Sequence, residues 1–122
     1  MSASSRRFLF LVRHSPLAGA RFRETLDMIF TVAAFDQWVT VLFLDDGVFQ
    51  LVAPLGEHSA SDLLWGPMLK AMDFYDIHEI LVDEQSLRLR GLTASDLVIG
   101  AALVAPEHVR TLLGQHDRLV VC

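Results

Sequence analysis

Five short apolar runs, spread over the whole chain, constrain the fold more than any other feature of the sequence. They lie at 8–12, 39–44, 80–82, 97–99 and 119–121, and they are rich in Val, Ile, Leu and Phe. Most lack the alternation of apolar and polar residues that marks a half-exposed strand, and continuous apolar runs are typical of a parallel sheet buried on both faces. We therefore expect a five-stranded sheet with helices on both sides.

Segments with helical signals separate these runs. A helix between the first two runs is indicated by apolar residues at helical spacing, namely Phe22, Leu26, Ile29 and Ala33. A second helix is expected after Ser61, a suitable N-cap residue. A third is expected at 85–89 before Gly91, and a fourth at 106–114, beginning on a proline and ending on a glycine. Strands and helices therefore alternate, and right-handed crossovers would arrange them as one open, mostly parallel α/β sheet with flavodoxin-like layering.

Length and composition indicate one packed domain over residues 1–122. The chain has a mass of 13.6 kDa, 52% apolar residues and 20% charged residues, which suits one folded core and is too short for two domains. No apolar run approaches the roughly 18 residues needed to cross a bilayer, and the first residues do not form a signal peptide. Because Cys122 is the only cysteine, no intrachain disulfide can form. The cytoplasm is the expected location.

Charge and residue spacing argue against several classes of function. The formal net charge of −5, with only 10 Lys and Arg, does not suit a surface that neutralises phosphates. The glycine patterns of dinucleotide and P-loop sites are absent. The histidines lack the spacing of a zinc site, and they are His14, His58, His78, His108 and His116. We expect no cofactor, no metal site, no direct contact with nucleic acid and no membrane contact.

The loop after the first expected strand offers an alternative function. In open α/β sheets, ligands bind beyond the carboxyl ends of the strands. The segment Leu-Val-Arg-His at 11–14 resembles the strand end of histidine phosphatases, in which an imidazole attacks phosphorus and arginines hold the phosphate. Ser15 stands where that family has glycine, which weakens the likeness. A small hydrolase using His14 is therefore the alternative, and its further ligands would be His108 with Arg88 or Arg90.

Two other loops carry carboxylates at expected strand ends. Asp45 and Asp46 could bind Mg²⁺ or act as acid and base, but adjacent residues point in different directions and Asp-Gly is a common turn. Asp83 and Glu84 follow the third run, and we expect solvated or helix-capping carboxylates there. No catalytic, cofactor-binding or metal-binding residue is assigned from these loops.

Three stretches go beyond the fold class. The first is Gly-Ala-Arg-Phe-Arg-Glu-Thr-Leu-Asp at 19–27, and the second is Asp-Asp-Gly-Val-Phe-Gln-Leu at 45–51. The third runs from Phe-Tyr-Asp-Ile at 74–77 to Ser-Leu-Arg-Leu-Arg-Gly-Leu at 86–92. Together, in this order, they resemble the TusC/DsrF family over nearly the whole chain.

The resemblance implies a DsrE-like fold and a place in a hetero-oligomer that passes persulfide sulfur between proteins. The expected partners are TusB-like and TusD-like subunits, or DsrH-like and DsrE-like ones. The first assembly serves 2-thiouridine formation in tRNA, and the second belongs to sulfur-oxidising bacteria. In both, the principal relay cysteine lies on the DsrE/TusD-type subunit. A homo-oligomeric DsrF-like protein outside the relay is a further alternative.

Sulfur chemistry gives this chain an accessory role within that resemblance. Persulfide exchange requires a thiolate, because sulfur moves by nucleophilic attack at sulfur. The family's relay position, just after the third strand, corresponds here to Asp83, which cannot carry sulfane sulfur. Cys122 is the only other candidate, and it lies away from that position. We expect no catalysis by this chain alone and a structural role in the complex.

The apolar content independently favours association with another subunit. A domain of this size has a limited interior, so part of an apolar share of 52% has to remain on the surface. Aromatic and aliphatic side chains near loops are candidate interface anchors, and they are Phe49, Leu51, Trp65 and Tyr75. Each of them could equally belong to the core.

Overall fold

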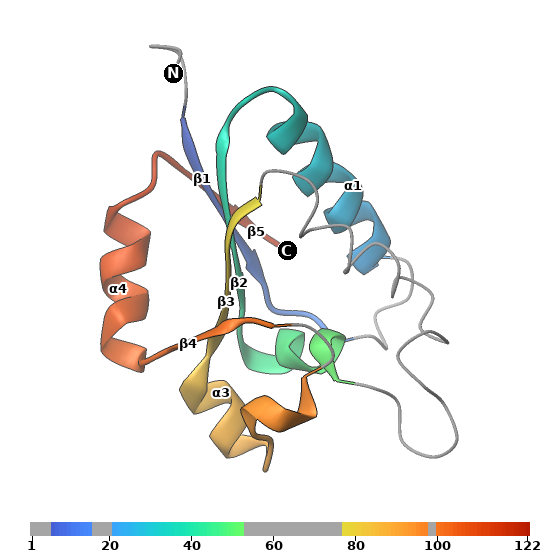
Figure 1. Ribbon diagram of the computed structural model, residues 1–122, viewed down its shortest axis with the longest axis vertical. Coiled ribbons are helices and arrows are strands. Elements are labelled where there is room, and N and C mark those ends of the chain that lie inside the picture. Colours follow the sequence, from blue (N-terminus) through green and yellow to red (C-terminus); the bar gives the residue numbers. More distant parts are fainter. Residues whose placement is uncertain (1–5, 16–20, 53–76, 98–99) are drawn as a thin grey trace.

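The computed structural model describes residues 6–15, 21–52, 77–97 and 100–122. Its elements, in chain order, are β1 (Arg7–Val12), α1 (Arg21–Ala34), β2 (Trp38–Phe43), the 3-10 helix η2 (Asp45–Leu51), β3 (Ile77–Asp83), α3 (Glu84–Leu89), the 3-10 helix η4 (Ala94–Asp96), β4 (Ala102–Val104), α4 (Pro106–Gly114) and β5 (Arg118–Val121). The strands form one sheet in the order β4-β3-β2-β1-β5 (Figure 1). Every neighbouring pair is parallel.

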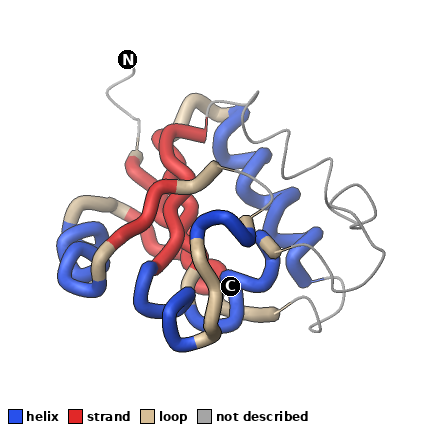
Figure 2. The backbone as a smooth tube through the Cα atoms, turned by 60° about the horizontal axis from the view of Figure 1, so that its bottom comes forward, coloured by secondary structure: helices blue, strands red, loops and turns tan. Residues whose placement is uncertain are grey.

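Helices α1 and α4 lie on opposite faces of this sheet, and α3 lies at its carboxyl edge (Figures 1 and 2). The architecture therefore confirms the predicted open parallel α/β fold with helices on both sides. The helices predicted around Phe22, at 85–89 and at 106–114 are confirmed as α1, α3 and α4. The helix expected after Ser61 lies outside the described residues. No helix of the described part is long and apolar enough to cross a membrane.

The predicted position of the fourth strand is wrong. The sequence placed it at 97–99, whereas β4 is Ala102–Val104 and pairs with β3 from Leu81 to Asp83. Leu97 instead follows η4 and forms an isolated antiparallel bridge with Val52. Both segments are short and apolar, so strand preference alone could not tell which of them pairs with β3.

Two apolar layers of unequal size enclose the sheet. Alternate residues of β1 point to opposite faces, so Phe10 and Val12 pack on the α1 side and Leu9 and Leu11 on the α4 side. The α1 layer includes fully buried Phe22, Leu26 and Ile29 from the helix itself. In contrast, α4 contributes only partly buried side chains, Val109, Leu112 and Leu113. Most of the hydrophobic stabilisation therefore comes from the α1 side, where each buried Leu, Ile or Phe contributes about 1.5–3 kcal/mol.

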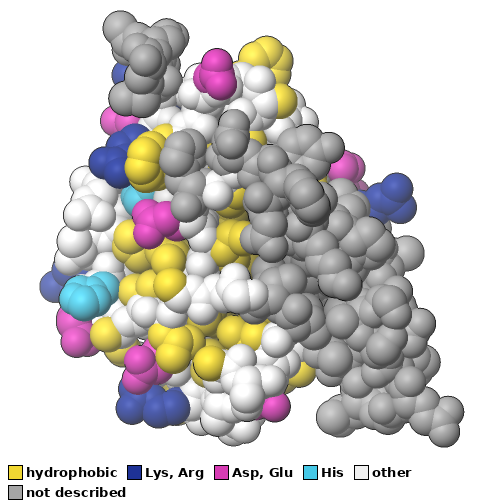
Figure 3. Space-filling model, in the orientation of Figure 1, with side chains coloured by type: hydrophobic (Ala, Val, Ile, Leu, Met, Phe, Trp, Pro, Cys, Tyr) yellow, Lys and Arg dark blue, Asp and Glu magenta, His cyan; other side chains and the backbone are white. Residues whose placement is uncertain are grey.

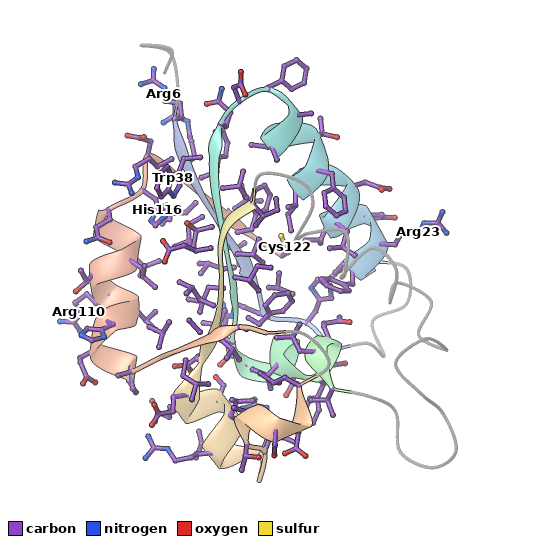
Figure 4. All side chains as sticks on the ribbon, viewed as in Figure 1. Arg6, Arg23, Trp38, Arg110, His116 and Cys122 are labelled. Atoms are coloured by element: carbon purple, nitrogen blue, oxygen red, sulfur yellow. The ribbon has the colours of Figure 1, made fainter. Side chains whose placement is uncertain are left out.

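A histidine secures α4 to the sheet. His116 follows the helix, and its Nδ1 lies 2.6 Å from the carbonyl oxygen of Leu112. Its Nε2 lies 3.1 Å from Oγ1 of Thr40, a fully buried residue of β2 (Figure 4). A carbonyl oxygen can only accept, so Nδ1 carries the proton and Nε2 accepts from the Thr40 hydroxyl. The imidazole thus joins the last turn of α4 to the middle of the sheet.

Replacing this imidazole should destabilise the fold. His116→Ala leaves the Thr40 hydroxyl buried without its partner, and we expect the free energy of unfolding to fall by about 1–3 kcal/mol. Urea denaturation followed by circular dichroism measures the change. Arg110→Ala, at an exposed position of the same helix, is the matched control and should leave the midpoint unchanged. Equal midpoints for both variants would contradict the role of His116.

Candidate functional site

Polar side chains from three strand ends form one hydrogen-bonded chain at the carboxyl edge of the sheet. Arg13, just after β1, donates from Nε to Oδ2 of Asp45 at 2.8 Å. The backbone N–H of Asp45, after β2, donates to Oγ of Ser86 at 2.8 Å. Ser86 Oγ in turn donates to Oδ2 of Asp83, at the end of β3, at 2.6 Å. The ends of β1, β2 and β3 are thereby joined through side chains as well as through the sheet.

Asp83 caps helix α3. It has extended backbone angles, and its Oδ2 accepts from the backbone N–H of Ser86 at 3.2 Å as well as from the serine hydroxyl. A carboxylate at this position accepts a hydrogen bond from an N–H that the helix leaves unpaired, and its negative charge interacts favourably with the positive end of the helix dipole. The side chain is 9% exposed, and its Oδ1 is buried without a hydrogen-bond partner. The helix-capping interpretation of Asp83 is thus confirmed.

The adjacent carboxylates of Asp45 and Asp46 form ion pairs with two different arginines. Asp45 pairs with Arg13, while Asp46 accepts from Nη2 of Arg90 at 3.0 Å. The two carboxylates are therefore held apart, which does not suit a shared Mg²⁺. Within the described residues, no group of three His, Cys, Asp or Glu side chains could hold a metal ion.

The backbone after β2 passes unusually close to β1. A Cβ added to Gly47 would lie 1.8 Å from the carbonyl oxygen of Val12, and that oxygen also accepts from the N–H of Leu44 at 3.0 Å. Only glycine allows this approach. The turn places Asp45 and Asp46 at the strand ends, so the geometry of the whole edge depends on Gly47.

Gly47→Ala should therefore disturb both the fold and this edge. The obstacle is backbone that cannot rotate away, so we expect a loss of about 2–4 kcal/mol in the free energy of unfolding. Gly114→Ala is the matched control, because a Cβ there would meet nothing within 4 Å. Thermal denaturation of the two variants should show a large fall in Tm for the first and none for the second. A Tm for Gly47→Ala equal to that of the unchanged protein would refute the close approach.

His14 does not face a phosphate site. Its ring packs edge-on against Phe22 with centroids 6.2 Å apart, and both ring nitrogens are buried without hydrogen-bond partners. Its carbonyl oxygen accepts from Nε2 of Gln50, a residue only 1% exposed. His14 thus lies in the α1 layer, whereas His108 is exposed on α4 across the sheet. Arg88 and Arg90 pair with Glu84 and Asp46. The geometry gives the hydrolase hypothesis no support.

Cys122 lies beyond β5, at the same edge of the sheet but far from Asp83. Strands β2 and β1 separate β3 from β5, so the two positions are roughly 14 Å apart at the usual strand spacing. The thiol lines a shallow hollow of about 230 Å³ together with Arg21, Glu24, Thr25, Met28 and Val121 (Figure 4). Burial raises the pKa of the Cys122 thiol, and the nearby Thr25 hydroxyl lowers that pKa in part. The thiol is therefore mostly protonated at neutral pH and a weak nucleophile.

This environment predicts slow alkylation of Cys122. Because the thiolate is the reacting form and its pKa is raised, the rate with iodoacetamide should reach half its maximum above pH 9.0, the ordinary value. Thr25→Val removes the nearby hydroxyl that lowers this pKa in part, so the rate at pH 8 should fall further. Thr31→Val, which alters a hydroxyl on the exposed side of the same helix, should have no effect. Rapid alkylation at pH 7 would contradict this assignment.

The proposed interface anchors have different outcomes. Leu51 is fully buried in the α1 layer, so of the two alternatives left open for it the core is the one that the structure supports. Phe49 is half-buried, and Trp65 and Tyr75 lie outside the described residues. The roles of Ser86 and Gln50 were not predicted. Ser86 stands three residues after the expected capping residue Asp83, and this spacing is the signal that could have revealed the part of Ser86 in the cap.

Comparisons with known proteins agree with this architecture. The sequence profile of the DsrE/DsrF-like family matches residues 6–122. A "Protein TusC homolog" of Vibrio parahaemolyticus is 38% identical, covering 91% of this chain and 94% of its own length. The "Intracellular sulfur oxidation protein DsrF" of Allochromatium vinosum is 39% identical, covering 80% of this chain and 72% of its own length.

The fold resembles solved structures with little sequence similarity. The ychN protein of E. coli superposes with a TM-score of 0.77 at 9% identity, covering 96% of this chain and 99% of that one. Protein MTH1491 of Methanobacterium thermoautotrophicum gives 0.74 at 15% identity, covering 97% and 100%. Sheet order, layers and superposition define a DsrE-like α/β domain. The chain belongs to the DsrE/DsrF-like family, and its curated relatives place it with the TusC and DsrF proteins.

Proposed function

We propose that this chain is a non-catalytic structural subunit of a sulfur-relay complex of the TusBCD/DsrEFH type, acting in the cytoplasm in support of 2-thiouridine formation in tRNA. The observation that carries the proposal is that the side chain of Asp83 caps helix α3. The last residue of β3, which is also the N-cap of α3, is thus a carboxylate. The names of the TusC and DsrF relatives support the assignment to a sulfur relay.

The chemistry of persulfide exchange explains why such a subunit is accessory. An acceptor thiolate attacks the outer sulfur of a donor persulfide, the S–S bond breaks, and the donor leaves as a thiolate. A carboxylate cannot take either part. Asp83 is moreover fixed by Ser86. Cys122 is a weakly ionised thiol roughly three strand spacings away. Sulfur would therefore pass through a partner subunit while this chain supplies contact surface.

The expected partners are a TusB-like and a TusD-like subunit. Co-expression of the three proteins from the same organism, followed by native mass spectrometry, should give a complex that contains all three. The same preparation should thiolate tRNA when it is supplied with a persulfidated cysteine desulfurase, a thiol reductant, ATP and the organism's tRNA-thiolating enzyme, which activates the uridine oxygen as a leaving group. Failure of this chain to join the complex would refute the proposal, and a complex that forms without supporting thiolation would point to the sulfur-oxidation pathway instead.

Sulfur transfer through the assembled complex should survive Cys122→Ser. The raised pKa of the thiol and its distance from Asp83 give it no route into the relay. Thiolated tRNA should form at a rate within about twofold of the unchanged complex, within the range expected for a neutral substitution. The control is the corresponding change of the relay cysteine in the TusD-like partner, which should abolish thiolation.

Mass spectrometry shows whether Cys122 of this chain carries sulfur during transfer. One added sulfur atom raises the mass by about 32 Da. A persistent adduct on Cys122, together with loss of thiolation in Cys122→Ser, would show that this chain carries sulfur and is not only structural.

A further inference from the structure

Strand β5 presents unpaired backbone groups along one edge of the sheet. The N–H of Cys122 donates to the carbonyl oxygen of Leu11 at 2.8 Å, and its own carbonyl oxygen accepts from Arg13 at 3.0 Å. Both backbone groups of Cys122 therefore point toward β1. Because these groups alternate in direction along a strand, those of Leu119 and Val121 point away from β1. Strand β5 is the last in the sheet order, so in the described part of the chain no strand pairs with them.

The side chains of the same two residues are apolar and exposed. Leu119 is 48% exposed and Val121 is 62% exposed. They stand beside Leu9 and Leu11 of β1, which are buried in the α4 layer, so they extend that layer toward the edge. Proteins usually protect an edge strand with lysine, proline, a bulge or a covering segment. Of these devices, β5 has no lysine, no proline and no bulge.

We propose that β5 pairs antiparallel with β5 of a second copy of this chain, about a two-fold axis at Val120. In this register Leu119 of each copy faces Val121 of the other as a hydrogen-bonded pair, so all outward N–H and C=O groups of the two residues are used. The two Val120 residues form the non-hydrogen-bonded pair between them. The two five-stranded sheets then become one continuous sheet.

The strand is complementary to itself in hydrogen bonding, in side chains and in charge. Leu119 and Val121 of the two copies form one apolar stripe on the α4 side, where cross-strand pairs of this kind are favourable. Arg118 is the only charged residue of β5. The register places the two Arg118 residues at opposite ends of the pair, roughly 13 Å apart along the strands, which exceeds the screening length at physiological salt. A second copy therefore satisfies the edge without a mismatched group.

The opposite side of the molecule offers a weaker candidate surface. Hydrophobic side chains gather over β3 and β4 beside α4 (Figure 3), around a hollow of about 250 Å³ whose lining includes Leu81, Leu103 and Leu112. Nothing in its shape or charge indicates what would cover it. Strand β4 forms the other edge of the sheet. Leu103, 46% exposed, is therefore a suitable control position.

The pairing does not rest on the sulfur-relay function, and the isolated full chain tests it. Size-exclusion chromatography with light scattering at tens of micromolar should give twice the chain mass of 13.6 kDa. Leu119→Lys with Val121→Lys places charges on the edge without touching the core, and the dimer Kd should rise at least about tenfold. Leu103→Lys should leave the dimer intact, and circular dichroism should show all variants folded.

Any other pattern overturns the proposal. A monomeric or trimeric unchanged chain would do so, as would a dimer that survives both lysines on β5. Dissociation by Leu103→Lys with no effect of the β5 substitutions would move the interface to the opposite edge.

A disulfide tests the register itself. In the Cys122→Ser background, Val120→Cys places two thiols in the non-hydrogen-bonded pair, with Cα atoms about 4.5 Å apart, a distance that a disulfide spans. Oxidised glutathione accepts the two electrons, and each thiol releases a proton as the S–S bond forms. Val121→Cys in the same background should not link, because its counterparts lie diagonally at about 7–8 Å. Absence of the Val120→Cys link, or linking of Val121→Cys instead, would show that the register is wrong.

Discussion

The hydrogen bonds of Ser86 join parts of the molecule that the sheet alone does not fix. Its hydroxyl accepts from the backbone of Asp45 and donates to Asp83, and its own N–H completes the cap of α3. The segments after β2 and β3 are thereby held in one arrangement, with Arg13 adding the end of β1. In many α/β proteins such an edge is where a ligand binds. Here the polar groups mainly satisfy one another.

The two apolar layers differ in how completely their side chains are buried. The α1 side holds most of the fully buried side chains, including Phe10, Phe22 and Phe43. The α4 side is covered by one short helix without a fully buried residue, and apolar side chains remain exposed at both edges of the sheet, at Leu103 of β4 and Leu119 of β5. Exposed apolar surface next to a well-packed core is typical of proteins that work in assemblies.

The fold was predictable from the sequence because parallel strands buried on both faces appear in it as continuous apolar runs. Continuous apolar runs located four of the five strands, and Gly91 and Pro106 marked helix boundaries that the structure confirms. The fourth strand was misplaced because two short apolar segments competed for one partner. Which of them reaches β3 depends on the capped turn at Thr93 and on the bridge of Leu97, and neither is visible in local periodicity.

The candidate site was less predictable, because its contacts join residues far apart in sequence. That Asp83 caps a helix follows from spacing, but the bond from Asp45 to Ser86 spans 41 positions. The burial of Leu51 and of the His14 ring nitrogens depends on how η2 and α1 pack. The family resemblance supplied what local rules could not, namely that Asp83, at the end of β3, is the position to compare with a relay cysteine.

The pairing of β1 with β5 also governs the order in which the chain can fold. The two strands meet across long sequence distances, as in the bond from the backbone of Arg7 to the Asp117 carboxylate, 110 positions apart. During synthesis β1 emerges first and keeps one edge unpaired until β5 arrives, and such late, non-local pairing slows folding and exposes apolar strands to aggregation. The β5 edge therefore forms only after the four strands that precede β5 in the chain have been synthesised. A ribosome-bound chain lacking β5 can expose β1 but cannot yet offer that edge to another protein.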